Sequence, residues 1–181
     1  MAYLTREQAI IEHRKMWNWI AEQLEMQPSD DKCNVNIYFL KVKYCEINGF
    51  TREKKGKPEH YCFCCQYAFS LYDCRECPLY WETENSIREY FCEYGMKYDN
   101  ILPNVGLWSI LYKADLTYKE AAEIAKQIAN LPEKIYQNKE NGNFHFSYNE
   151  MCIEAKELYG LNGWFDWKKY YEVKPLQNSA K

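Results

Sequence analysis

Long apolar runs, histidines and the motifs of common enzymes are all scarce in this chain of 181 residues. No stretch approaches the roughly 18 consecutive apolar residues that a membrane span requires. The first ten residues include Arg6 and Glu7, where a secretory signal peptide needs its apolar segment. We therefore expect a soluble protein of the cytoplasm that makes no contact with a membrane.

No familiar catalytic motif is present. The sequence has no G-x-x-x-x-G-K-[ST] phosphate loop, no G-x-G-x-x-G, no H-E-x-x-H and no G-x-S-x-G. A zinc deaminase needs H-x-E, but Cys62 stands where the glutamate would follow His60. Of the three histidines, we expect His13 to be a partly buried side chain with satisfied hydrogen bonds, and the neighbours of His145 indicate packing. These observations favour a protein that is not an enzyme.

Positive charge is also limited. Lys and Arg together number 23 against 26 Asp and Glu, and the net charge of −3 argues against binding to nucleic acid through bulk positive charge. The exception is a dense basic segment that precedes His60 and Tyr61 and contains Arg52, Lys54, Lys55 and Lys57. Cations beside aromatic rings suit phosphate contacts and base stacking, so these four residues are our candidate nucleic-acid or partner contacts. A solvated loop is the alternative.

The apolar spacing predicts a mainly α protein forming a single domain over 1–181. Capping-box patterns at Thr5, Thr117 and Ser147 begin three predicted helices, over 6–26, 118–131 and 148–159. Residues 35–47 fit a strand or a helix, and Asn48 followed by Gly49 favours the helix. Short helices are also expected near 86–94 and 106–115.

Other parts of the pattern are less regular. We expect a loop over 133–143 and possible short strands near 35–45 and 143–147. The aromatic segment 163–174 contains Trp164, Phe165 and Trp167, and its spacing does not choose between helix and strand. Its rings suit the core better than a protein-binding patch.

The most specific signal is a pair of C-x2-C motifs within residues 58–81. Cys62 and Cys65 form the first motif, Cys74 and Cys77 the second, and eight residues separate them. Two such turns can complete the tetrahedral four-sulfur shell that zinc prefers. Four thiolates leave no open position for water, so the pattern predicts a structural zinc knuckle inserted in the helical domain.

Alternatives to this zinc shell remain. Cys64 or His60 could replace one of the four ligands, and an iron–sulfur cluster also accepts four cysteines. A redox C-x-x-C normally begins a helix in a strand–helix alternation, which the sequence does not indicate. The other cysteines lie among apolar residues and are expected in the core: Cys33, Cys45, Cys92 and Cys152.

Three parts of the chain carry a resemblance to known proteins. The stretches HRKMWNWIAE, CFCCQYA with CRECPL, and AKQIANLPEK resemble small zinc-knuckle proteins encoded by phages and prophages of Firmicutes. The resemblance implies work in the bacterial cytoplasm, as a stoichiometric inhibitor of a host defence nuclease. Anti-CRISPR proteins directed at Cas9 with its guide RNA are the nearest case. A zinc-stabilised regulator that binds nucleic acid directly is the alternative.

Overall fold

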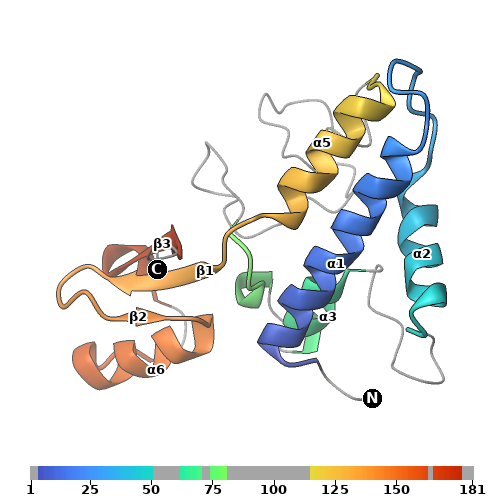
Figure 1. Ribbon diagram of the computed structural model, residues 1–181. Helices are drawn as coiled ribbons and strands as arrows, with labels where there is room; N and C mark the ends of the chain where they lie inside the picture. Colours follow the sequence, from blue (N-terminus) through green and yellow to red (C-terminus); the bar gives the residue numbers. More distant parts are fainter. Residues whose placement is uncertain (1–3, 51–61, 71–73, 81–114, 163–164, 177–181) are drawn as a thin grey trace, which may run out of the picture.

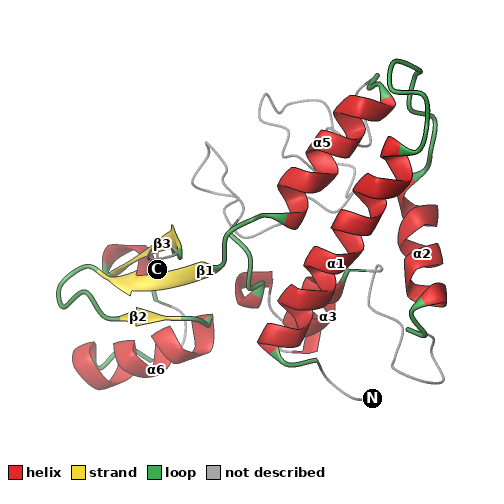
Figure 2. Ribbon diagram, in the orientation of Figure 1, coloured by secondary structure: helices red, strands yellow, loops and turns green. Residues whose placement is uncertain are grey.

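The computed structural model describes residues 4–50, 62–70, 74–80, 115–162 and 165–176, and these form a helical part and a smaller part built on a sheet (Figure 1). The helical part contains α1 (Arg6–Glu25), α2 (Ile37–Ile47), α3 (Phe63–Ser70), the short 3-10 turn η2 (Cys74–Glu76) and α5 (Tyr118–Ala129). The second part contains β1 (Lys134–Asn138), β2 (Phe144–His145), α6 (Tyr148–Tyr159), the 3-10 turn η3 (Trp167–Lys169) and β3 (Tyr171–Pro175). The expectation of a mainly α protein is confirmed (Figure 2).

Helix α1 is the centre of the helical part. The predicted capping box is present, because Gln8 N–H donates to Thr5 Oγ1 at 3.2 Å and Thr5 N–H donates to Gln8 Oε1 at 3.0 Å. Helix α5 lies along α1 and presents small residues to it, including the fully buried Ala125. Small side chains let the two backbones approach closely, and the larger α1 side chains fill the remaining space.

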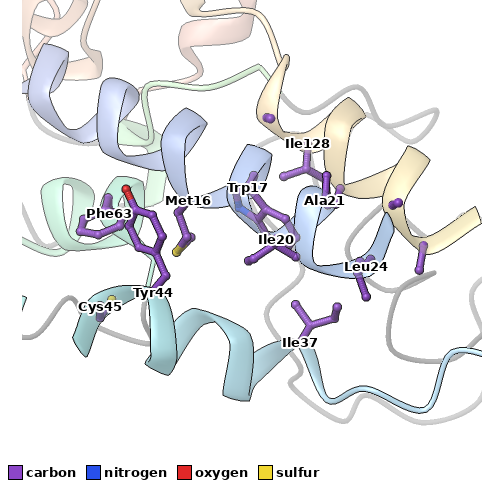
Figure 3. Packing of buried hydrophobic residues seen from close by; sticks show 14 of the residues in the cluster. Met16, Trp17, Ile20, Ala21, Leu24, Ile37, Tyr44, Cys45, Phe63 and Ile128 are labelled. Carbon is purple, nitrogen blue, oxygen red and sulfur yellow. The ribbon is translucent and has the colours of Figure 1, made fainter. Parts of the chain in front are cut away.

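Helix α2 packs on another side of α1. The segment that fitted either a strand or a helix is a helix, begun by the side chain of Asn36, which accepts from Tyr38 N–H at 2.9 Å. It ends at Ile47 with Asn48 as its C-cap, and Gly49 follows in the left-handed conformation with φ of 71°. Figure 3 shows Ile37 and Tyr44 of α2 facing the apolar side chains of α1.

The sheet of the second part is antiparallel, in the order β2–β1–β3. β1 corrects the expectation of a loop over 133–143, whereas β2 confirms the short strand expected near 143–147. β1 is buried on both faces, so it shows no alternation of polar and apolar residues. Its partner β3 comes from the aromatic tail, with Tyr136 opposite Val173. A pairing between such distant segments leaves no local trace in the sequence.

The aromatic tail lies mainly in the core of this second part. Trp167 is 7% exposed, and its ring lies 5.7 Å from the ring of Tyr136 in an edge-to-face arrangement. Phe165 packs against the same cluster, whereas Trp164 lies outside the described residues. The core interpretation of the tail is therefore confirmed for Trp167.

The short helices expected near 86–94 and 106–115 fall outside the described residues, apart from Asp115. Within the described ranges, no helix combines the length and the apolar character needed to cross a bilayer.

Candidate metal centre and its surroundings

The first C-x2-C motif lies where α3 begins. Cys62 immediately precedes the helix, and the backbone N–H of Cys65 donates to Cys62 Sγ at 3.4 Å. The sulfur therefore takes the place of the side-chain oxygen that usually caps a helix, and the positive end of the helix dipole favours its thiolate form. The sequence did not predict α3, because eight residues with three aromatic rings and two cysteines show little periodicity.

The surroundings of Cys62 favour a charged sulfur. A hydrogen bond from the side chain of Cys65 is the largest cause and lowers the pKa of Cys62 well below its usual value, although burial opposes this. His13 and the positive charge of Lys41 lower the pKa further. A thiolate at neutral pH is the form that binds a metal ion, because the protonated thiol is a poor ligand.

The second motif reaches the same region of the core. Cys77 is 4% exposed and shares an apolar cluster with Cys62, Ile10 and Leu79, against which Cys65 also packs. The side chain of Cys74 is not among those described. In the described part of the chain, no three His, Cys, Asp or Glu side chains lie close enough together to hold a metal ion. Three of the four predicted zinc ligands are thus gathered in one cluster, without forming a completed shell.

Cys64 has a different neighbour from the other cysteines of the motif. Its Sγ–H donates to the backbone carbonyl of Ala9 at 3.8 Å, and the side chain is 1% exposed. This contact turns the thiol toward the backbone of α1 and makes Cys64 a packing residue between α1 and α3. The other alternative ligand, His60, lies outside the described residues.

The structure also bears on the redox alternative. The Cys62–Cys65 pair does begin a helix, so that part of the sequence argument against thiol–disulfide chemistry is wrong. Cys62 is 8% exposed, however, and a disulfide partner must reach the attacked or attacking sulfur. Burial of this thiol suits a structural role better than exchange with another protein.

His13 is the most unusual polar side chain near these thiols. It is 1% exposed, and its Nε2 lies 3.1 Å from the backbone carbonyl oxygen of Ile128. Its Nδ1 is buried and has no hydrogen-bond partner of regular geometry, although the ring is close enough to affect the pKa of Cys62. A buried polar atom without a partner costs about 1–3 kcal/mol. The expected burial of His13 is confirmed, but the expectation of satisfied hydrogen bonds is wrong.

The second C-x2-C motif also joins the two parts of the molecule. Glu76 accepts from the N–H groups of Tyr148 at 3.2 Å and Asn149 at 2.9 Å, which are the first two donors of α6. Arg75 Nη1 donates to the hydroxyl of Tyr148 at 2.8 Å, and the guanidinium lies 4.0 Å from that ring's centroid. The carbonyl of Arg75 accepts from Lys134 Nζ at 2.6 Å. Arg75 and Glu76 lie between Cys74 and Cys77, so an interaction that holds these two cysteines in place also holds the junction in place.

A second polar cluster lies around Glu154 in the sheet part, and the sequence did not predict it. Hydrogen-bond donors surround the carboxylate: Asn138 Nδ2 at 3.0 Å, Asn141 Nδ2 at 3.3 Å, Asn143 Nδ2 at 2.9 Å and the Tyr171 hydroxyl at 2.7 Å. His145 Nε2 lies 3.1 Å from Glu154 Oε2 without a hydrogen bond of regular geometry.

The cluster around Glu154 suits a structural role. Burial alone would raise the pKa of Glu154, but the surrounding hydrogen bonds outweigh it and lower the pKa to about 2. Such a carboxylate is a weak base at neutral pH, so it does not suit general base catalysis. It ties the β1–β2 turn to α6 and orients His145, which agrees with the packing role expected for that histidine.

The four candidate contacts of the basic segment, Arg52, Lys54, Lys55 and Lys57, lie outside the described residues. Phe50 and Phe63 lie on either side of this segment. Phe50 is 7% exposed and Phe63 is fully buried, and their ring centroids lie 4.8 Å apart. The residues that flank the segment are thus neighbours in the core, and Phe63 is the first residue of α3.

Comparison of the chain with protein-family models, curated proteins and solved structures finds no match.

Proposed function

We propose that the protein is a zinc-stabilised interaction protein that binds a macromolecular partner stoichiometrically. The observation that carries this proposal is the position of the thiols: Cys62 and Cys77 are buried in one cluster between α1 and α3, where a metal would hold elements together. A buried four-ligand zinc site has no open position for substrate, which suits a structural ion in a non-enzymatic protein.

The partner we propose is a bacterial defence nuclease, with Cas9 and its guide RNA as the leading target. This follows from the resemblance to phage proteins, and the contact between the residues on either side of the basic segment supports it. The Phe50–Phe63 contact anchors both flanks of that segment in the core beside the proposed zinc site. A segment whose two ends are fixed in the core loses less conformational freedom when it binds a nucleic acid held by the target.

The test is a cleavage assay with titrated protein. Replacement of Arg52, Lys54, Lys55 and Lys57 by alanine should weaken inhibition of the nuclease at least tenfold, while zinc content and melting temperature stay unchanged. The matched control replaces four lysines that are exposed elsewhere in the structure, Lys15, Lys43, Lys119 and Lys156, and should inhibit as the wild type does. Equal inhibition by both variants would remove the basic segment from the proposal.

The wild-type protein and the alanine variant also distinguish this function from that of a direct nucleic-acid regulator. Wild-type protein should retard the nuclease–guide complex in a gel but not naked DNA or RNA at similar concentrations. Retardation of naked nucleic acid, with a steep dependence on salt that the alanine variant loses, would establish the regulator instead.

A further inference from the structure

The buried ring of His13 is placed to serve the proposed zinc site from α1. His13 lies one turn after Ile10, which packs in the cluster of Cys62 and Cys77, and four residues after Ala9, whose carbonyl accepts from Cys64. Residues three and four apart share one face of a helix. His13 is therefore on the side of α1 that faces the beginning of α3.

The hydrogen bond of the ring decides which nitrogen is available. A carbonyl oxygen only accepts, so the Nε2 atom that lies 3.1 Å from the Ile128 oxygen must carry the hydrogen. In the neutral ring Nδ1 then has a lone pair, and this atom is the one that is buried without a partner. A histidine that binds a metal through one nitrogen usually donates the other N–H to a carbonyl or a carboxylate, as His13 does here.

We propose that His13 Nδ1 is a zinc ligand and that it completes a shell with Cys62, Cys65 and Cys77. This inference rests on the zinc site of the proposed function and changes its composition, because His13 takes the place predicted for Cys74. A Cys3His shell is among the ordinary tetrahedral sets for structural zinc. Coordination gives the orphaned Nδ1 a partner and ties α1 and α5 to the metal, since Ile128 belongs to α5.

The described side chains do not form this shell, because no three of them lie close enough together to hold a metal ion. Cys62, Cys77 and Ile10 share one buried cluster, against which Cys65 packs, and His13 follows Ile10 by one turn of α1. Metal binding would draw the three thiolates and the imidazole inward and release the protons that the thiols still hold.

The test is X-ray absorption spectroscopy of the zinc-loaded full chain, which counts sulfur and nitrogen ligands. We expect three sulfurs at roughly 2.3 Å and one nitrogen at roughly 2.0–2.1 Å. His13→Asn should lose the nitrogen signal and bind zinc at least about tenfold more weakly, the low end of what removal of even an outer partner costs. Cys74→Ser should keep the wild-type shell.

His60→Asn is the matched control, because His60 is the other histidine next to the cysteines and the alternative source of a nitrogen ligand. Its spectrum should equal that of the wild type. A four-sulfur shell in the wild type, or a nitrogen signal that His60→Asn removes, would overturn the His13 assignment and leave a zinc-stabilised protein. Absence of zinc from the wild type would overturn the zinc site itself. The wild-type and His60→Asn spectra decide the matter even if His13→Asn fails to fold.

Discussion

At the residue scale, Glu154 makes the stability of the sheet part depend on pH. Its pKa in the folded protein is about 2, below the ordinary value of 4.5, so the unfolded chain takes up the proton first as the pH falls. The stabilisation is therefore complete above about pH 4.5 and is lost as the pH falls toward 2.

Glu154→Gln should lower the free energy of unfolding by about 2–4 kcal/mol at pH 7, because the new amide group faces hydrogen-bond donors in a buried site. The difference from the wild type should shrink at pH 3. Urea unfolding of the wild type and the variant at pH 7 and pH 3 measures the loss of stability and its change with pH. Glu157→Gln, at an exposed position of the same helix, should change stability by less than about 0.5 kcal/mol. A difference that stays constant from pH 7 to pH 3 would contradict this account of Glu154.

At the element scale, α6 depends on a cap from outside its own segment. Ser147 Oγ accepts from Glu150 N–H at 3.1 Å, as the sequence predicts, but the first two donors of the helix are held by Glu76, more than 70 residues earlier. Glu76 is 5% exposed and its negative charge lies at the positive end of the helix dipole.

Glu76→Gln should cost about 1–2 kcal/mol of stability, because glutamine keeps one acceptor and turns an N–H donor toward another donor. Chemical denaturation followed by circular dichroism measures the loss. Glu123→Gln, on the exposed face of α5, is the control and should behave like the wild type. If the two variants lost equal stability, Glu76 would not be the cap of α6.

At the scale of the whole molecule, the proposed zinc ion lies next to the junction that joins the two parts. Zinc removal should lower the melting temperature by at least about 10 °C, since each kcal/mol is worth roughly 2–4 °C in a chain of this size and structural zinc contributes several. It should also speed hydrogen exchange at the amides of Tyr148 and Asn149, because Glu76 would no longer be fixed against them.

The comparison is a calorimetric scan and an exchange experiment with and without a chelator. A variant with Cys62→Ser and Cys65→Ser should already have the lower melting temperature, and the chelator should not lower it further. A chelated wild type that melts and exchanges like the untreated protein would show that no structural metal holds the junction.

The sequence by itself determined the elements whose signals are local. The capping residues Thr5, Thr117 and Ser147 indicated where three helices begin, since each side chain accepts from the N–H group three positions later. Gly160, with φ of 65°, likewise marked the end of α6. The close spacing of the cysteines also predicted that they lie near one another, and Cys62, Cys65 and Cys77 do meet in one cluster.

Only the tertiary structure decided what depends on distant partners. β1 pairs with β3, and α6 is capped by Glu76. The buried Nδ1 of His13 without a partner is likewise a result of tertiary packing. Each of these features joins segments separated by tens of residues or more, and no periodicity or spacing within either segment records such a contact. Short-range hydrogen bonds depend on residues that are neighbours in the sequence and can therefore be predicted from it. Burial depends on how the whole chain folds.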